Sequence, residues 1–384
     1  MFLKMKIAID LKNCSLYGRG ITMFITNFLS DYNSVYKERN DVLLLAPDFN
    51  FITPANKSVF DNYDKLPTHS INKASKISKV LYDQFHLNNF LNKLKPDIFF
   101  SPYFDLPYLY DGLTITTIHD LSILFLKNSY SYFFYKYYEI LLRKSIKVSS
   151  KILTVSEFSK NEILNSFPKL SNDNVIVIYN KSSQSIINFS INPITYFEKY
   201  FEKYCSFNLP QNFVLYTGGF ENRKNIDLLI NGYLNATKQC SSIPPLVLTG
   251  VTKKAFSEFR LMEFKNNNLI FLDYVSEELL PLFYANADLI VNTSRYEGFG
   301  IPILDALTTR RPILCSNLSV YKEIAKDLPI YFENDDINDF INKLVSFFYG
   351  KLPYPDLDQY YERSKFFNNT CNKEAILNTF NISI

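Results

Sequence analysis

A loop in the second half of the chain carries residues whose types and spacing suit the binding of an anion. It runs SRYEGFGIPILD over residues 294–305, after a predicted strand over 288–293 and before a predicted helix with proline in its first turn. Such a strand, loop and helix place free backbone N–H groups at the carboxyl edge of a parallel sheet, where they can bind phosphate. We therefore predict that Gly298, Phe299 and Gly300 line an anion site.

Two carboxylates accompany this loop. Glu297 lies in the loop itself, where it can accept hydrogen bonds from neutral hydroxyl groups. Asp305 lies about one turn into the helix, within reach of a vicinal diol such as that of a ribose. Together they suit a sugar joined to a nucleotide diphosphate. An ordinary turn, in which an acidic residue caps the helix, is the alternative for this segment taken alone.

A second segment of the same half carries two adjacent cations. It runs TGGFENRKN over residues 217–225, between a predicted strand and a predicted helix. Gly218 and Gly219 permit a close approach of a ligand to the backbone. Arg223 can donate two parallel hydrogen bonds to phosphate oxygens, and Lys224 offers them a compact positive charge. Two cations beside the partially positive start of a helix are unfavourable. An anionic ligand therefore explains the segment better than a solvated charged surface does.

The first half of the chain contains two weaker signals. Gly18 and Gly20 lie between the first predicted strand and its helix, as in a glycine-rich anion loop, although the GxGxxG spacing is absent. His119 ends a strand predicted over residues 113–119, so its imidazole faces the cleft if two domains oppose one another. A histidine whose hydrogen bonds are satisfied within a turn is the alternative.

The predicted helix from about Tyr132 to Val148 is both aromatic and basic. Its residues include Phe133, Phe134, Tyr137, Tyr138, Lys136, Arg143, Lys144 and Lys147. An amphipathic helix of this composition can rest on an anionic membrane, or it can pack on a core and expose a solvated basic face. The sequence favours the second interpretation.

The elements that position these residues alternate between short apolar strands and helices of period 3.6, which is typical of an α/β fold. A chain of 384 residues is long for one core, so we expect two domains. We predict a first domain over residues 1–195, a second over 196–365, and a helix over 366–384 that packs back on the first. The Ser- and Asn-rich stretch over 181–211 is the predicted irregular connection.

Composition excludes several classes of protein. The formal net charge of +3 gives no basis for a nucleic-acid partner. The five cysteines lack any CxxC or zinc-ligand spacing, which indicates reduced thiols and a cytoplasmic location. We expect no metal site, since Asp335 and Asp336 are interpreted as helix caps, and structural roles for His69 and His86. No apolar stretch is long enough for a predicted membrane span.

Taken together, these segments resemble the retaining glycosyltransferases of family 4, the glycosyl transferases group 1, over nearly the whole chain. The segments that carry the resemblance are IAID with the GRGI loop, TIHDL over residues 117–121, ILTVSEFSKNEI over 152–163, IYN over 178–180, GGFENRKNIDLLI from residue 218 and LPLFYANADLIVNTSRYEGFGIPILDAL from residue 280. The resemblance implies the GT-B fold, in which two Rossmann-like, doubly wound domains face a central cleft. It also implies a donor held mainly by the second domain and an acceptor held mainly by the first.

By this resemblance Arg223 and Lys224 contact the diphosphate, Glu297 binds the donor sugar, and His119 lies near the donor sugar and the acceptor. Asp305 takes the second acidic position of the E-x7-E motif of the family, and departs from it because Asp is one methylene shorter than Glu. A second departure is the pair Arg310 and Arg311, where relatives usually carry a small residue or glycine.

The function implied is retaining transfer of a hexose from a GDP- or UDP-sugar to a hydroxyl of a glycan or lipid-linked oligosaccharide, without a metal or another cofactor. The RKN and IHDL segments favour GDP-mannose, since the versions of the family that carry them often use it. The expected setting is bacterial surface polysaccharide synthesis, in the cytoplasm, with peripheral contact to the inner membrane as an option. Two alternatives stay open: another GT-B enzyme, such as a sugar-nucleotide epimerase or phosphorylase, and a catalytically silent subunit that binds nucleotide sugars.

Overall fold

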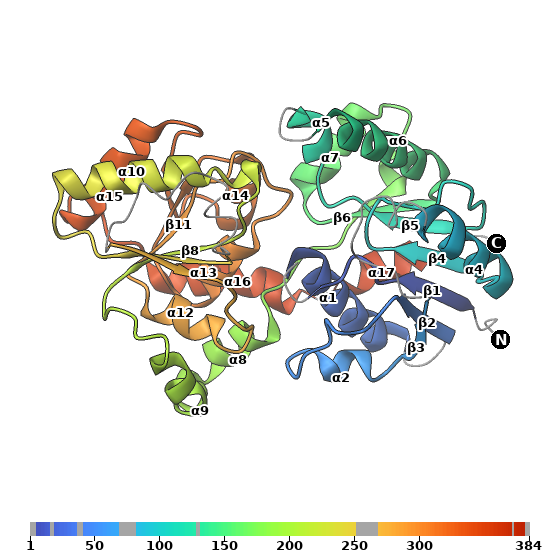
Figure 1. Ribbon diagram of the computed structural model, residues 1–384, viewed down its shortest axis with the longest axis horizontal. Helices are drawn as coiled ribbons and strands as arrows, with labels where there is room; N and C mark the ends of the chain where they lie inside the picture. Colours follow the sequence, from blue (N-terminus) through green and yellow to red (C-terminus); the bar gives the residue numbers. More distant parts are fainter. Residues whose placement is uncertain are drawn as a thin grey trace. The chain divides into compact units, whose positions relative to one another are not determined.

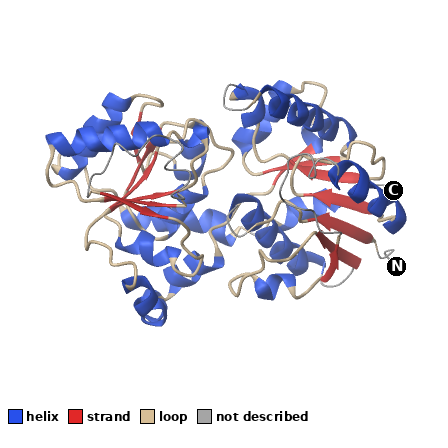
Figure 2. Cartoon of the chain, in the orientation of Figure 1, coloured by secondary structure: helices blue, strands red, loops and turns tan. Residues whose placement is uncertain are grey.

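A computed structural model describes residues 5–15, 19–36, 41–68, 82–127, 131–250, 268–370 and 372–380. The chain forms two compact units, Met1–Asn180 with Cys371–Ile384, and Lys181–Thr370. Each unit holds one parallel sheet with helices packed on it (Figures 1 and 2). The chain leaves the first unit after Asn180, whereas the sequence predicted a domain boundary after residue 195.

The first unit contains a seven-stranded sheet in the order β3-β2-β1-β4-β5-β6-β7, with all neighbours parallel. The strands are β1 (Lys6–Asp10), β2 (Asp41–Ala46), β3 (Asp64–Pro67), β4 (Ile98–Ser101), β5 (Thr114–Thr117), β6 (Lys151–Thr154) and β7 (Val175–Val177). The helices are α1 (Arg19–Tyr36), α2 (Lys57–Phe60), α4 (Asn88–Leu94), α5 (Ser122–Phe125), α6 (Tyr132–Val148), α7 (Glu157–Ser166) and α17 (Lys373–Phe380), with a π-helical turn over Tyr82–Leu87 and a 3₁₀ turn over Asn172–Asn174.

Strand β4 illustrates why this sheet is covered on both faces. Its two adjacent phenylalanines point to opposite faces, as the period of a strand requires, and both are fully buried. Phe99 packs in a cluster with Leu91 of α4, while the ring of Phe100 lies 4.8 Å from that of Phe28 in α1. A strand that is apolar on both sides is typical of a parallel sheet between two layers of helices.

The C-terminal helix α17 packs on α1 within the first unit. Phe380 makes ring contacts with Phe28, Tyr32 and Tyr36, at centroid distances of 6.3, 5.3 and 6.0 Å. Asn372, which precedes α17, is buried and donates from Nδ2 to Asp31 Oδ2 at 3.0 Å. Asn372 and α17 therefore complete the core of the unit in which the chain begins.

The second unit contains a six-stranded parallel sheet in the order β10-β9-β8-β11-β12-β13. The strands are β8 (Val214–Thr217), β9 (Leu246–Thr249), β10 (Leu269–Leu272), β11 (Leu289–Asn292), β12 (Ile313–Ser316) and β13 (Ile330–Phe332). The helices are α8 (Gln184–Ile191), α9 (Pro193–Cys205), α10 (Ile226–Gln239), α12 (Leu280–Asn286), α13 (Ile301–Thr308), α14 (Ser319–Ala325), α15 (Ile337–Phe348) and α16 (Leu357–Asn369). Helices α10 and α15 cover one face of the sheet, while α12 and α13 cover the other (Figure 1).

The predicted irregular connection over residues 181–211 is wrong, because most of it forms α8 and α9. Each helix has a capping side chain: Ser183 Oγ accepts from the Ile186 N–H, and Asn192 Oδ1 accepts from the Thr195 N–H. Pro193 then occupies the first turn of α9, where its fixed φ favours the helix. The Asn192-Pro193 pair was the signal of a helix start that the composition of the stretch concealed.

A group of polar side chains, of which Ser182 and Thr308 are buried, joins the two ends of the second unit. The N–H of Ser182, near its first residue, donates to Asn368 Oδ1 at 2.9 Å. Ser182 Oγ lies 3.0 Å from Thr308 Oγ1 at the end of α13, and Asn368 Nδ2 donates to the same oxygen at 3.0 Å. The segments by which the chain enters and leaves this unit are thus held to each other and to α13.

Candidate functional site

The predicted donor residues lie at the point where the strand order of the second sheet reverses. Strands β8 and β11 are neighbours there, and the chain runs outward from them in opposite directions. A 3₁₀ turn over Asn222–Lys224 follows β8, and the loop that contains Glu297 follows β11. Open α/β sheets bind ligands at this position, outside the carboxyl ends of the strands.

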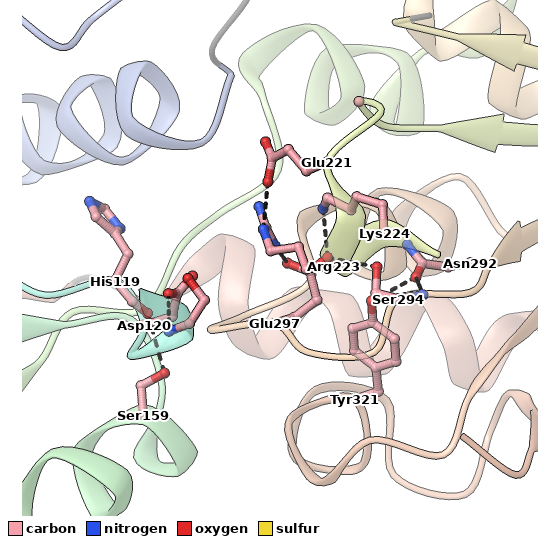
Figure 3. Close-up of polar contacts among 12 residues, drawn as sticks. His119, Asp120, Ser159, Glu221, Arg223, Lys224, Asn292, Ser294, Glu297 and Tyr321 are labelled. Carbon is pink, nitrogen blue, oxygen red and sulfur yellow. Dashed lines mark hydrogen bonds and ion pairs between the residues drawn. The ribbon is translucent and has the colours of Figure 1, made fainter. Parts of the chain in front are cut away.

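Arg223, Lys224 and Glu297 meet in one cluster (Figure 3). Arg223 Nη1 lies 2.5 Å from Glu297 Oε2, and Lys224 Nζ lies 2.5 Å from Glu297 Oε1. Ser294 Oγ donates to Glu297 Oε1 at 2.8 Å, and Arg223 Nε lies 2.5 Å from Glu221 Oε2. The two cations that the sequence assigned to a phosphate are therefore bound to the carboxylate that it assigned to a sugar.

The carboxylate of Glu297 is ionised in this cluster. Burial by itself raises the pKa of Glu297, but the charges of Arg223 and Lys224, with hydrogen bonds from Lys224 and Ser294, lower the pKa to about 2. The two cations are paired with two carboxylates, the buried Glu297 and Glu221, whose side chain is 60% exposed. An incoming diphosphate would compete with Glu297 for the same donors.

Hydrogen bonds join the two loops of the cluster. The Arg295 N–H donates to the carbonyl oxygen of Arg223 at 2.7 Å, and Thr293 Oγ1 donates to that of Lys224 at 3.1 Å. Asp335 accepts from Arg295 Nε at 2.6 Å and from Asn225 Nδ2 at 2.8 Å. The two cations consequently extend from a backbone that is fixed relative to Glu297.

Only one of the two aspartates predicted as caps of α15 has that role. Asp336 accepts from the N–H groups of Asn338 and Asp339, at 2.9 and 3.0 Å, as an N-cap does. Asp335 has a φ of 63° and directs its carboxylate to the loops of the cluster instead. The prediction of a cap is wrong for Asp335, because adjacent residues in a turn point in different directions.

A buried chain of polar groups supports Glu297 from below (Figure 3). Tyr321, fully buried in α14, donates from its hydroxyl to Asn292 Oδ1 at 2.8 Å, and the same oxygen accepts from the Ser294 N–H at 3.1 Å. Ser294 then holds Glu297. Sequence reasoning missed Asn292 and Tyr321. The polar Asn292 at the end of an otherwise apolar strand, in the sequence LIVN, was the available signal.

Replacement of Tyr321 by phenylalanine removes one buried hydrogen bond of this chain. We expect the free energy of unfolding to fall by about 1 kcal/mol and, if the chain positions Glu297, donor affinity to fall roughly five-fold. Tyr360→Phe is the matched control, because Tyr360 is also fully buried and donates to a carbonyl oxygen, that of Leu328. Urea unfolding and donor titration of both variants give the comparison. Equal donor affinities in the two variants would contradict a positioning role.

The glycines of the two loops differ in whether the structure has room for a side chain in their place. Gly300 has a φ of 123°, and a Cβ there would lie 2.7 Å from the ring of Tyr321. A Cβ on Gly218 would lie 2.7 Å from the Tyr216 hydroxyl, whereas nothing lies within 4 Å of one on Gly219. Gly298 lies in the turn that follows Glu297. Gly300 is therefore required by backbone geometry, whereas a side chain at Gly219 would meet no obstruction.

Phe299 and Asp305 are buried in the second unit rather than displayed at the loop. The Phe299 side chain is 4% exposed and makes an edge contact with Phe367 of α16 at 5.7 Å. Its side chain therefore packs in the core, and only its backbone can line an anion site. Asp305 is 0% exposed within α13. Its contact with a ribose stays a prediction, and it requires the ligand to reach an enclosed carboxylate.

In the first unit, Gly18 lies outside the described residues, and Gly20 differs from its prediction. Helix α1 begins at Arg19, so Gly20 belongs to its first turn and not to the preceding loop. Gly20 is exposed, and nothing lies within 4 Å of a Cβ built on it. The local geometry supplies no steric reason for a glycine there. Of the two histidines with predicted structural roles, His69 lies outside the described residues and His86 is exposed.

His119 follows β5 by two residues and is half-buried. Its Nε2 lies 2.9 Å from the carbonyl oxygen of Pro102. Because a carbonyl oxygen only accepts, Nε2 carries the proton, which leaves Nδ1 as an acceptor in the neutral ring. Burial lowers the pKa of His119, against smaller opposing effects of the Pro102 carbonyl and Asp120. The neutral ring therefore predominates at pH 7 and can accept a hydrogen bond from a hydroxyl.

Two kinds of feature are absent from the described residues. They contain no group of three or more His, Cys, Asp or Glu side chains that could hold a metal ion. None of their helices combines the length and the apolar character that crossing a membrane requires. The four cysteines among them, Cys14, Cys205, Cys240 and Cys315, are free thiols.

Comparison with known proteins gives matches to both halves of the chain. A family described as glycosyl transferases group 1 matches residues 201–347, and glycosyltransferase family 4 matches residues 36–180. O-antigen chain mannosyltransferase B of Escherichia coli is 30% identical over 253 residues, which are 65% of this chain and 64% of that protein. O-antigen chain mannosyltransferase RfbU of Salmonella typhimurium is 29% identical over 57% of this chain and 56% of that protein. The alignments thus span less than two thirds of either relative.

Solved structures share the fold. WaaG, a glycosyltransferase involved in lipopolysaccharide biosynthesis, superimposes with a TM-score of 0.74 over 97% of this chain and 100% of that chain, at 14% identity. HepE of Anabaena in complex with UDP-glucose gives a TM-score of 0.70 over 97% of this chain and 98% of that chain, also at 14% identity. At such identities the likeness establishes the GT-B fold, with its two parallel Rossmann-like sheets.

Proposed function

Because this chain belongs to glycosyltransferase family 4, the glycosyl transferases group 1, we propose that it transfers a hexose from a nucleotide sugar to a hydroxyl acceptor with retention of configuration. The observation that carries the proposal is the cluster of Arg223, Lys224 and Glu297 at the reversal of strand order in the second sheet. That position suits a nucleotide diphosphate, and the two cations match its charge.

In the proposed reaction the acceptor hydroxyl attacks the anomeric carbon from the face that the diphosphate leaves. The bond between the anomeric carbon and the diphosphate oxygen breaks, the new glycosidic bond forms, and a phosphate oxygen takes the proton of the acceptor. No protein nucleophile is required. Arg223, Lys224 and the start of α13 stabilise the charge that develops on the diphosphate.

Glu297 has two successive partners in this proposal. Before the donor binds, its carboxylate holds Arg223 and Lys224 at 2.5 Å each, which keeps both side chains ordered beside the loop. When the diphosphate takes over these donors, the carboxylate turns to the hydroxyls of the donor sugar. The exchange replaces one set of charge-assisted hydrogen bonds by another, so that no buried charge is left unpaired.

His119 is proposed to act beside the sugar as an acceptor of hydrogen bonds. Its proton on Nε2 is engaged by the Pro102 carbonyl, and Nδ1 keeps a lone pair. A neutral imidazole at this position suits a hydroxyl of the sugar or acceptor, and it does not add positive charge near the reacting carbon. The proposed contact of Asp305 is with the ribose of the donor.

The donor is proposed to be GDP-mannose, since the two relatives named above are described as O-antigen mannosyltransferases. The acceptor is then a glycan or lipid-linked oligosaccharide of bacterial surface polysaccharide synthesis. The proposed place of the reaction is the cytoplasmic side of the inner membrane. No metal ion takes part in the proposed step.

A thermal-shift panel of GDP-, UDP- and ADP-sugars tests the donor. A ligand at 100 times its Kd stabilises the folded state by about 2.7 kcal/mol, so GDP-mannose is expected to raise the Tm by several degrees and above every other sugar nucleotide. A larger increase in Tm with a UDP-sugar would mean that the donor is that sugar nucleotide and not GDP-mannose, while the proposed class of reaction would stand. No shift with any member of the panel would contradict the proposed function.

Product analysis tests the reaction itself. Incubation with GDP-mannose is expected to release GDP only in the presence of a hydroxyl acceptor, and NMR of the product is expected to give an α-linkage. An isomerised sugar nucleotide formed without acceptor would indicate an epimerase. Donor binding without release of nucleotide, with or without acceptor, would indicate a silent binding subunit.

A further inference from the structure

Helix α6 of the first unit presents an exposed face on which apolar and basic side chains alternate. The face consists of Phe133, Lys136, Ile140, Arg143 and Lys147, which recur at intervals of three and four residues. Phe133 is 85% exposed and Ile140 is 53% exposed. From Phe133 to Lys147 the face is about 21 Å long, at 1.5 Å per residue.

The opposite side of α6 packs in the core. The buried residues of the helix are Tyr135, Leu141, Leu142, Ser145 and Ile146, and four of them belong to a core cluster with Ile118 and Ile152. The sequence favoured a core-packed helix with a solvated basic face. The core packing is present, but the outward side also carries large apolar groups, which solvation does not explain.

Helix α5 continues the same kind of surface. Phe125 at its end is 52% exposed, and the exposed Lys127 follows it. The two helices are in contact, and Figure 1 shows α5 beside one end of α6. Tyr132, at the start of α6, is 68% exposed. Aromatic residues thus gather where the two helices meet.

The charge of this surface is positive. It carries Lys127, Lys136, Arg143 and Lys147 against one carboxylate, Glu139, whose side chain is 14% exposed and pairs with Lys136 and Arg143 at 3.1 and 3.0 Å. Four cations and one carboxylate give a net charge of +3. An acidic partner is therefore electrostatically favoured.

We infer that the surface formed by α5 and α6 docks on a bilayer that contains anionic lipids. A protein partner would have to bury lysines among the apolar groups, and the centres of protein interfaces are depleted in lysine. At a membrane surface the aromatic and aliphatic side chains enter the headgroup region, while the long basic side chains reach up to the lipid phosphates. The inference rests on the proposed function, since a lipid-linked acceptor has to be met at that surface.

Co-sedimentation of the full chain with vesicles tests the inference. We expect the protein to sediment with vesicles of phosphatidylcholine that contain about 30% phosphatidylglycerol, to bind pure phosphatidylcholine at least 10-fold more weakly, and to dissociate as salt is raised. Phe133→Ser and Lys147→Glu are each expected to weaken binding to the anionic vesicles several-fold. Both positions are exposed, so the fold should be retained.

Ile194→Ser provides a matched control, because Ile194 is 72% exposed but lies on α9 of the second unit. Vesicle binding that is absent in the unmodified chain, or that Ile194→Ser lowers as much as Phe133→Ser does, overturns the inference. So does self-association in sedimentation velocity that Phe133→Ser abolishes, since the surface would then bind a second copy.

The donor panel separates this inference from the proposed function. Phe133→Ser and Lys147→Glu are expected to keep the Tm increase produced by GDP-mannose, because neither residue belongs to the cluster around Glu297. If the chain binds the donor but not the vesicles, only the inference about the membrane surface is contradicted. A chain that binds the vesicles but no sugar nucleotide contradicts only the proposed function.

Discussion

Replacement of Lys224 by alanine is expected to lower the turnover number about 100-fold, which is typical for the loss of one charged donor that stabilises a developing anion. Donor affinity should also fall, since Lys224 binds the diphosphate before and during the reaction. The measurement is steady-state kinetics of GDP release with saturating acceptor. Lys238→Ala is the control, because Lys238 is exposed on the far end of α10, and its turnover should not change.

A second variant separates the two tasks of Lys224, which are to bind phosphate and to neutralise Glu297. In Glu297→Gln the two cations lose the charge of their internal partner. We therefore expect GDP to bind at least as tightly as it does to the unmodified chain, while sugar transfer falls. Unchanged turnover and unchanged donor affinity in Lys224→Ala would contradict the role of this residue. Weaker GDP binding in Glu297→Gln would contradict the exchange of partners.

The stability of the protein in acid is expected to depend strongly on Glu297. Its pKa is about 2 in the folded protein and 4.5 in the unfolded chain, so the unfolded state binds more protons between these values. The resulting stabilisation, about 3 kcal/mol, is fully present above pH 4.5 and is lost as the pH falls toward 2. Urea unfolding at pH 7 and at pH 3 measures the loss.

Glu297→Gln should remove this pH dependence. The variant is expected to be less stable than the unmodified chain at pH 7, by up to about 3 kcal/mol, and the difference should shrink markedly by pH 3. Glu221→Gln is the control, because Glu221 contacts the same arginine but its side chain is 60% exposed. A difference between Glu297→Gln and the unmodified chain that is constant with pH argues against the lowered pKa.

The sequence predicted much of the second unit, because its strands and helices have clear hydrophobic periods. The strand predicted over 288–293 contains β11, and the helix predicted with proline in its first turn is α13. The ion pairs of Glu297 were not predictable, since its partners are 73 and 74 residues away in the chain. Periodicity places a residue on an element, whereas side-chain pairing depends on how two loops meet in space.

Arg310 shows how an unusual residue is accommodated. Its φ of 54° is the left-handed conformation that favours glycine, which accounts for the small residue or glycine expected here from the family resemblance. The guanidinium group lies 3.8 Å from the centroid of the Tyr361 ring in α16. A cation–π contact of this kind contributes about 1 kcal/mol, comparable to the cost of the left-handed backbone. The sequence shows that Arg310 departs from the pattern of the family, and the structure shows that its side chain contacts Tyr361.

Because the chain returns to its first unit, the two units differ in how complete each would be if it were expressed alone. The second unit is an insertion within the first, and its ends adjoin, because Ser182 and Asn368 are hydrogen-bonded at 2.9 Å. A polypeptide of residues 181–370 therefore begins and ends at one place and keeps its whole sheet. A polypeptide of residues 1–180 lacks α17 and bares the aromatic side chains of α1 that Phe380 covers. The chain passes between the units twice, after Asn180 and after Thr370. A single proteolytic cut between the units therefore leaves them covalently joined, and two cuts are needed to separate them.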